Sequence, residues 1–283
     1  MNALTVDVED YYQVSAFESV VDRSDWEHLP SRVERNMETL LALFAARGAR
    51  ATFFTLGCVA KRFPGMVRML VEQGHELASH GYDHTRVTQL TPEAFTKDVL
   101  DTKHMLEDIA GVAVRGYRAP TFSITSGNPW AFEILKETGH EYSSSVYPVK
   151  HDLYGWPAAP RFAFRHPRSG LLEVPITTVR MFGRNLPAGG GGYFRLYPYA
   201  LTRWALRHVN EIDGEPGVFY MHPWEIDHAQ PRQQGLSWKS RFRHYINLHR
   251  MEDRLESLLS NFKWGTMEQV FLAPRGESGE QAS

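Results

Sequence analysis

The segment Thr5-Val6-Asp7-Val8-Glu9-Asp10 closes an apolar run that begins at Ala3. A short apolar run that ends in a cluster of polar residues is typical of a buried β-strand, which we expect over residues 3–8. Because side chains alternate along a strand, Asp7 and Glu9 share one face. The chain therefore presents two carboxylates on the same side where its first strand ends.

Three further segments of reactive residue types each follow a stretch that also predicts a buried strand. They are His80-Gly81-Tyr82-Asp83-His84, Arg118-Ala119-Pro120-Thr121-Phe122 and Met221-His222-Pro223-Trp224-Glu225. In barrels of parallel strands, functional residues lie where strands end and loops begin. We therefore expect the four segments to meet at one site.

Short apolar runs alternate with amphipathic segments along most of the chain. Strands are expected at residues 3–8, 51–56, 75–79, 112–117, 142–146, 161–164, 171–176 and 217–221. Helices are expected at residues 31–48, 64–73, 91–111, 129–138, 196–210 and 238–260. This alternation predicts an α/β fold, with a parallel sheet and helices outside it. About seven strands favour a barrel over an open sheet.

The sequence contains no internal repeat and no linker that would mark a domain boundary, so we expect a single domain over residues 1–272. The small, polar tail at 273–283 is predicted to be disordered. The four-glycine run Gly189–Gly192 is predicted to form a flexible loop near the site.

The composition excludes several classes of function. The chain has 283 residues, 23% of them charged, and a net charge of −2, which gives no indication of a nucleic-acid-binding surface. Cys58 is the one cysteine, so neither an internal disulfide nor a multi-thiolate metal site can form. No signal peptide and no apolar run of about 18 residues is visible, which predicts a cytoplasmic protein without a transmembrane segment. Peripheral association with the inner membrane is the alternative, and the oligomeric state stays open.

His80 and His84 are candidate ligands of a divalent metal. On a helical turn, their spacing would put both imidazoles on one side. A carboxylate from the end of the first strand, Glu9 or Asp10, would complete a set of three ligands, and Asp7 would then be free to deprotonate a metal-held water. An isolated pair of this kind is more often solvated or structural, so the interpretation depends on the neighbouring segments.

The other two segments offer complementary chemistry. Arg118 is placed to pair with Asp7 and keep it ionised, and the backbone N–H of Thr121 is placed to face a developing oxyanion. His222 has the intrinsic pKa of a general acid near neutrality, and Glu225 is expected to orient it or to bind substrate. Phe122 and Trp224 offer flat faces that suit sugar rings.

With these segments in view, the chain resembles the polysaccharide deacetylases of carbohydrate esterase family 4, the NodB-homology group. The resemblance covers about Ala3 to Glu225 and implies a NodB-type distorted (β/α) barrel. It implies that Asp7 is the catalytic base, oriented by Arg118, and that His222 is the general acid. It also implies a metal, zinc by default with cobalt as a substitute, held by His80, His84 and either Glu9 or Asp10. The substrate would be an N-acetylated oligo- or polysaccharide, or its precursor.

Two departures from the family pattern matter. The common first motif has adjacent aspartates, whereas here Val8 follows Asp7. The fourth motif, an Asp with a later Trp, has no clean match, and residues 142–148 occupy its place. The sequence of several segments is similar to that of a bacterial subgroup of the family, which is associated with exopolysaccharide and exosortase loci. This subgroup has an extra C-terminal segment, which corresponds to about residues 226–272 here.

Three alternatives remain open. The same fold group includes cyclic amide hydrolases that need no metal, although both histidines are retained here. A set of two histidines and one carboxylate is also typical of non-haem iron oxygenases, but those usually sit in a β-sandwich. The departures from the family pattern also allow a carbohydrate-binding protein with an inactive site.

Overall fold

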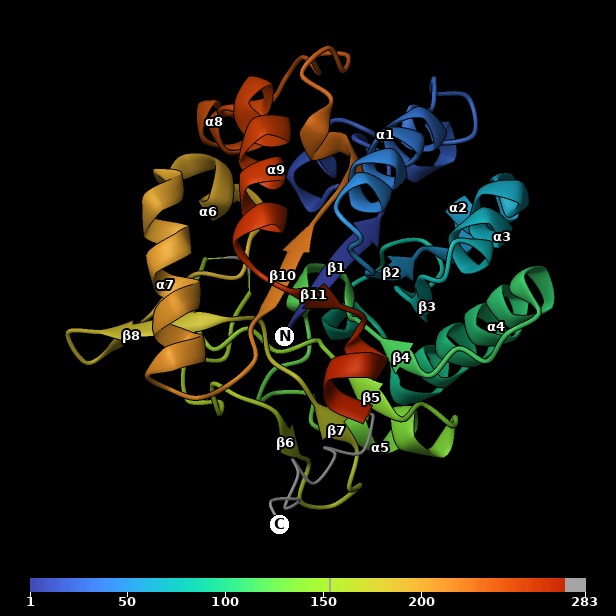
Figure 1. The fold of residues 1–283 in the computed structure, drawn as a ribbon. Coiled ribbons are helices and arrows are strands. Elements are labelled where there is room, and N and C mark those ends of the chain that lie inside the picture. The colour runs from blue at the N-terminus through green and yellow to red at the C-terminus, as the bar shows by residue number, and fades with distance from the viewer. Residues whose placement is uncertain (153, 273–283) are drawn as a thin grey trace.

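A curled, mostly parallel sheet forms the centre of the molecule and carries helices on its outer side (Figure 1). The computed structural model describes residues 1–152 and 154–272. In this part of the chain, seven strands run parallel in the order β10 (Val218–Met221), β1 (Asn2–Val8), β2 (Thr52–Thr55), β3 (Glu76–Ser79), β4 (Gly116–Tyr117), β5 (Tyr142–Ser143) and β7 (Leu172–Glu173). Two short strands complete the sheet, β6 (Phe164–Arg165) antiparallel to β7 and β11 (Trp264–Gly265) parallel to the start of β1.

The predicted α/β barrel class is therefore confirmed. The helices are α1 (Val33–Ala46), α2 (Gly57–Arg62), α3 (Pro64–Glu72), α4 (Pro92–Ala110), α5 (Trp130–Glu137), α6 (Gly191–Leu196), α7 (Tyr199–Glu211), α8 (Trp238–Tyr245) and α9 (Met251–Asn261). The apolar residues of α1 recur at helical spacing and are buried against β1, β2 and α9. Each such buried side chain contributes about 1.5–3 kcal/mol relative to exposure, so this packing fixes the position of β1.

The gap between β7 and β10 is bridged by irregular chain. The backbone N–H of Tyr220 donates to the carbonyl of Gly189 at 2.7 Å, and the N–H of Val218 donates to Thr177 Oγ1 at 2.6 Å. Gly190 forms a parallel bridge with Tyr220. The four-glycine run is thus largely a buried part of the barrel wall, because only glycine allows the backbone to approach β10 so closely.

The second half of the chain differs most from the expected elements. Residues 238–260 form two helices, α8 and α9, because Asn247 between them has a left-handed backbone (φ 52°). A hairpin of β8 (Thr178–Met181) and β9 (Arg184–Pro187) was not predicted. The predicted disordered tail, 273–283, lies outside the described residues. Among the described helices, none combines the length and the apolar character that a bilayer crossing needs.

We predict that Gly190→Ala destabilises the protein. Gly190 has φ +119°, and a Cβ there would lie 2.0 Å from the carbonyl oxygen of Tyr220. Strain and overpacking of this kind should lower the free energy of unfolding by about 2–4 kcal/mol, measured by urea denaturation. Gly65→Ala is the control, because a Cβ at Gly65 meets open space within α3. Equal stability of the two variants would contradict the tight closure.

Candidate metal centre and active site

Three buried side chains converge where β1 and β3 end. One ligand atom from each of Glu9, His80 and His84 lies within 4.8 Å of the others. Glu9 Oε2 is 3.1 Å from His84 Nε2 yet receives no hydrogen bond from any group in the described chain. A buried carboxylate oxygen without a donor, next to two imidazoles, fits the donor set of a tetrahedral divalent metal. These residues could hold a metal ion.

The two histidines are held in the neutral form that binds metals. His80 Nδ1 donates to the carbonyl of Arg118 at 2.8 Å, which leaves Nε2 facing the cluster. Burial lowers the pKa of His80 to about 4 and lowers the pKa of His84 well below its usual value. Burial, with a smaller contribution from Asp7, raises the pKa of Glu9 to about 7. A bound cation would offset the cost of charging this carboxylate.

The histidines converge through a loop and not through the expected helical turn. Residues 80–84 are irregular, and Gly81 and His84 both have left-handed backbones, with φ of 74° and 60°. A non-glycine residue held in this region costs about 1–3 kcal/mol and persists only where its surroundings require it. The conformation of His84 therefore supports a functional position.

Asp10 lies outside the cluster. Its Oδ1 accepts the N–H of Tyr11, and its Oδ2 accepts the hydroxyl of Ser31 and the N–H groups of Arg32 and Val33 at the start of α1. The carboxylate thus satisfies backbone donors at a helix N-terminus. Of the two carboxylates left open by the sequence, the geometry brings only Glu9 to the histidines.

Asp7 is paired with a fully buried arginine. Arg118 Nη1 donates to Asp7 Oδ1 at 2.6 Å and to Thr5 Oγ1 at 2.7 Å, and its guanidinium stacks 4.0 Å from the Phe54 ring centre. The second oxygen, Asp7 Oδ2, faces the cavity and lies 4.0 Å from His222 Nε2. One oxygen is therefore engaged, and the other is free to accept a proton.

The rest of the Arg118 guanidinium is satisfied by the segment that follows β5. Nε donates to the carbonyl of Ser144 at 3.1 Å, and Nη2 donates to its hydroxyl at 3.0 Å. Ser145 Oγ accepts the N–H of Ala119, and the buried carboxylate of Glu173 accepts the N–H groups of Ser145 and Val146. Residues 142–148, the place of the unmatched motif, thus hold the arginine in position.

His222 is oriented by a second buried pair. Its Nδ1 donates to Glu225 Oε1 at 2.7 Å, and Glu225 Oε2 accepts from Arg195 Nε at 2.6 Å. Burial acts to lower the pKa of His222, but Glu9, Glu225 and Asp7 together raise it to about 9. Both oxygens of Glu225 are occupied and the side chain is fully buried, so the geometry supports orientation of His222 and gives no access to substrate.

Trp224 packs behind the cluster. Its Nε1 donates to Glu9 Oε1 at 3.3 Å, and its ring stacks on His244 and His222 at centroid distances of 4.2 and 5.2 Å. Only 4% of the residue is exposed. Its indole therefore supports Glu9 and His222, and little of it is left to contact a sugar face.

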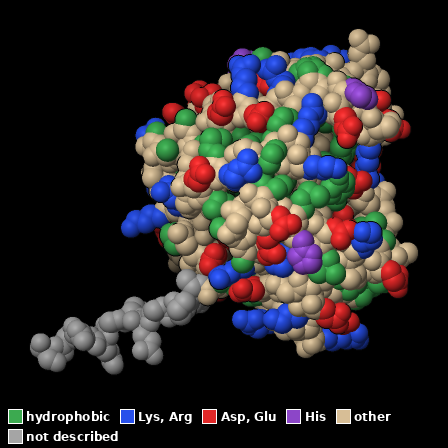
Figure 2. Space-filling model, turned by 90° about the vertical axis from the view of Figure 1, so that its right-hand side faces the viewer, with side chains coloured by type: hydrophobic (Ala, Val, Ile, Leu, Met, Phe, Trp, Pro, Cys, Tyr) green, Lys and Arg blue, Asp and Glu red, His purple; other side chains and the backbone are tan. Residues whose placement is uncertain are grey.

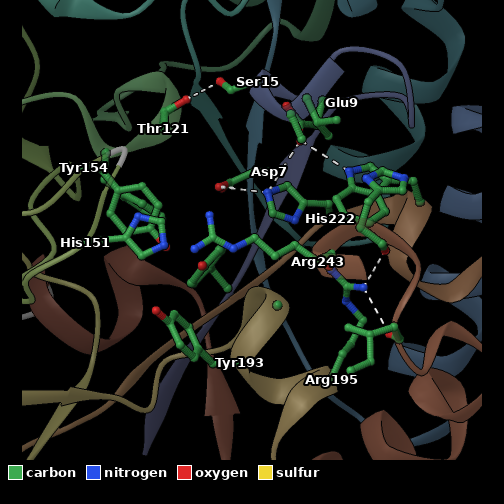
Figure 3. A pocket seen from close by; sticks show the side chains of 18 of the residues that line it. Asp7, Glu9, Ser15, Thr121, His151, Tyr154, Tyr193, Arg195, His222 and Arg243 are labelled. Atoms are coloured by element: carbon green, nitrogen blue, oxygen red, sulfur yellow. Dashed lines mark hydrogen bonds and ion pairs between the residues drawn. The ribbon is translucent and has the colours of Figure 1, made fainter. Parts of the chain in front are cut away.

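A cavity of about 430 Å³ opens onto these residues. Figure 3 shows Asp7, Glu9 and His222 gathered on one side. His151, Tyr154 and Tyr193 lie on the opposite side, and the side chain of Arg243 reaches between the two (Figure 3).

Thr121 and Phe122 form part of the same cavity wall. Both residues have left-handed backbones, with φ of 57° and 49°. Thr121 Oγ1 lies 2.7 Å from Ser15 Oγ, and the ring of Phe122 packs edge-on against Tyr147, Tyr154 and Tyr220. Both residues thus lie on the wall of the cavity into which the cluster opens.

The sequence did not single out Arg195, His151, Tyr154 or Arg243. Arg195 is almost fully buried at the end of α6 and acts through Glu225, which only the tertiary structure brings near. His151 and Tyr154 lie several residues beyond the predicted strand at 142–146, and Arg243 lies inside the predicted helix at 238–260, so none of the three stands directly at a strand end. Phe122, which was singled out from the sequence for its flat face, packs against Tyr154 on the cavity wall.

We predict that Asp10→Ala destabilises the protein without loss of metal. Removing the acceptor at the start of α1 should lower the free energy of unfolding by about 1–2 kcal/mol in urea denaturation. Metal content per chain, measured by mass spectrometry of metal-loaded protein, should stay unchanged. Asp108→Ala, at an exposed position on α4, is the control and should alter neither quantity. Loss of metal in the Asp10 variant would contradict this prediction and indicate that Asp10 is a metal ligand.

Two family models match consecutive parts of the chain. Residues 24–143 match a model described as polysaccharide deacetylase, and residues 144–272 match one described as a domain of unknown function, DUF3473. His80, His84 and Arg118 lie in the first match, His222 lies in the second, and Asp7 and Glu9 precede both. The sheet is continuous across the boundary, because β5 pairs with β7.

Curated relatives are similar over part of their length. A peptidoglycan deacetylase of Helicobacter pylori is 29% identical over 113 residues, 40% of this chain and 38% of that protein. A peptidoglycan-N-acetylglucosamine deacetylase of Bacillus cereus is 31% identical over 85 residues, 30% of this chain and 31% of that protein. The chain thus spans about a third of the length of these two relatives.

Solved structures share the fold. A Mycobacterium smegmatis protein assigned to the polysaccharide deacetylases superposes with a TM-score of 0.59 at 18% identity, covering 95% of this chain and 88% of that one. A variant of a CE4-family pseudoenzyme with restored enzymatic activity superposes with a TM-score of 0.50 at 14% identity, covering 95% of this chain and 66% of that one. At these identities the likeness establishes architecture alone.

Proposed function

Residues 24–143 of the chain belong to the polysaccharide deacetylase family, and from this we propose that the protein is a metal-dependent hydrolase that removes N-acetyl groups from sugars of a bacterial polysaccharide or its precursor. The observation that carries the proposal is the convergence of Glu9, His80 and His84 beside the free oxygen of Asp7 and the ring of His222. These groups come from the ends of three strands, β1, β3 and β10, and open into one cavity.

Glu9, His80 and His84 would hold the metal, with zinc as the default and cobalt as a substitute. Two neutral imidazoles and one carboxylate leave a tetrahedral ion a fourth position, as catalytic zinc sites require. When bound, the ion would polarise the amide carbonyl and make a water more acidic.

Asp7 would take the proton from the attacking water. Its Oδ1 is fixed by Arg118, so the free Oδ2 has a defined direction toward the cavity. The ion pair with a buried guanidinium holds the carboxylate in one orientation. Thr5, Phe54 and Ser144 hold the arginine from three sides, and this preorganises the base.

His222 would return a proton to the leaving amine. Because Nδ1–H is engaged by Glu225, the proton to be donated sits on Nε2, the atom that faces Asp7 and Glu9. The backbone N–H of Thr121 would donate to the developing oxyanion from the opposite wall. The products would be acetate and a free amino sugar.

The alternatives make different use of the same cavity. A cyclic amide hydrolase without metal would leave the buried, unpaired oxygen of Glu9 without a role. A carbohydrate-binding protein would retain metal and glycan but release no acetate, so acetate release decides between binding and catalysis.

We predict that two substitutions separate metal binding from catalysis. His80→Ala should lose both metal and acetate release, because it removes a ligand. Asp7→Asn should keep the metal and lose about 10²–10⁴-fold in turnover, because it removes the base. Metal content and acetate release from N-acetylated oligosaccharides are the two measurements. Full activity in Asp7→Asn would show that another group is the base, and metal retention in His80→Ala would show that the cluster is not the metal site.

We also predict a catalytic cost for Glu225→Gln. A neutral amide would replace the carboxylate that links His222 to Arg195, so His222 would lose its charged partner. We expect kcat to fall about 10–100-fold, while KM and metal content stay near those of the wild type. Glu225→Asp should recover part of kcat, because the charge returns. A rise in KM at constant kcat would instead indicate that Glu225 contacts substrate.

A further inference from the structure

A second hollow adjoins the candidate active-site cavity. It is a groove of about 1030 Å³ between residues 148–162 and the hairpin β8–β9, and Tyr193 lines both the groove and the cavity. Neighbouring residues of the chain also contribute to both, with Val149 and Lys150 in the groove and His151 and Tyr154 in the cavity. Asn185 donates to the carbonyl of Pro148 at 2.9 Å and ties the two walls together. A chain molecule seated in the cavity would therefore leave it along this groove.

The groove is lined by cations and, among the described residues, by no acid. The four basic residues that line it are Lys150, Arg161, Arg180 and Arg184. Arg161 pairs with Asp213 at 2.8 Å, which offsets its charge. Lys150, Arg180 and Arg184 are exposed, and each forms no ion pair within residues 1–152 and 154–272. Three positive charges are thus free to meet a ligand.

This concentration of charge is local. The chain as a whole has a net charge of −2, and on the face over α2–α4 basic and acidic side chains are interspersed (Figure 2). Next to the groove, Lys239 and Arg243 on α8 share the single carboxylate of Asp152, which adds a further net positive charge at the cavity. Figure 3 shows the Arg243 side chain extending across the cavity toward His151 and Tyr154. The positive surface therefore extends from the groove to the side of the cavity on which Arg243 lies.

We propose that the substrate is an anionic N-acetylated glycan, whose acidic residues lie in this groove while the N-acetyl group to be removed sits in the cavity. The inference rests on the proposed function and names its substrate class. Guanidinium groups pair well with the carboxylate of a uronic acid or with a phosphate, and exposed cations along a groove attract a polyanion in a salt-dependent way. It also gives the region that matches a domain of unknown function a role in holding substrate.

The test measures binding, so it does not require turnover. The probe is a hyaluronan hexasaccharide, which alternates N-acetylglucosamine with glucuronic acid, and the control ligand is the same hexasaccharide with its carboxylates methyl-esterified. Calorimetric titration of metal-loaded wild-type protein at low salt should give about tenfold tighter binding of the acid than of the ester. The difference should shrink at roughly physiological ionic strength. Equal affinity for the two ligands, or no binding of either, would overturn the proposal.

Two matched variants locate the effect. The triple variant Lys150→Gln, Arg180→Gln and Arg184→Gln should lose the preference for the acid and bind the ester as the wild type does. The variant Arg35→Gln, Arg68→Gln and Lys136→Gln removes the same charge from exposed positions on α1, α3 and α5 and should keep the preference. If the preference for the acid persists in the first variant, or is lost in the second, the groove is not where the acidic residues bind. Equally tight binding of a short single-stranded DNA would show a general polyanion site instead.

Failure of the proposed function has a separate signature. If metal-loaded protein binds the acidic hexasaccharide through the groove but releases no acetate from any N-acetylated oligosaccharide, the proposed glycan-binding groove is supported and the proposed deacetylase activity is refuted. If acetate is released equally well from acidic and neutral oligosaccharides, the proposed deacetylase activity is supported and the proposed preference for an anionic glycan is refuted.

Discussion

The site depends on the burial of one guanidinium. Arg118 is completely inaccessible to solvent, and an arginine always carries its charge, so its donors must find partners inside the protein. The partners are Asp7 and Thr5 on β1 and Ser144 after β5. Removing any of them would leave a buried charge incompletely compensated, which is far more costly than losing a surface ion pair. This requirement fixes the end of β1, and with it the direction of Glu9, relative to β3 and β4.

A second buried arginine repeats the arrangement on the other side of the cavity. Arg195 holds Glu225, and its other donors bind the carbonyls of His244 and Ile246. The pair therefore links the end of β10 to α6 and to the end of α8. Both groups proposed to move protons thus depend on a buried carboxylate–arginine pair: Asp7 is itself paired with Arg118, and His222 is oriented by the pair of Glu225 and Arg195.

Much of the fold could be predicted from the sequence, because the residue patterns that indicate strands and helices are local. Alternation along the first strand predicted a shared direction for Asp7 and Glu9, and both line one cavity although Glu9 lies just past the end of β1. Helical spacing identified the buried side of α1. The convergence of segments from four strand ends also followed, because parallel strands share one catalytic edge.

What the sequence could not give depends on the surroundings of each residue. The start of α1 distinguishes Glu9 from Asp10, because the carboxylate of Asp10 accepts a backbone N–H group there and Glu9 is left to face the histidines. The left-handed backbone of His84 replaced a helical turn, and the left-handed Asn247 divided one expected helix into two. Arg195 lies in α6, a helix that was not predicted, and its partners are distant in the chain, so no periodic signal marks it.

The pairing of β1 has a consequence for how the molecule is made. Strand β1 is central in the sheet, yet one of its edges pairs with β10 at residues 218–221, and the start of its other edge pairs with β11 at residues 264–265. Contacts between positions so far apart form late and slow folding. The edge of β1 that pairs with β10, together with the acidic residues at its end, therefore stays uncovered until residues 218–221 have been synthesised. During that interval a chaperone, or premature pairing with another nascent chain, would compete for the same edge.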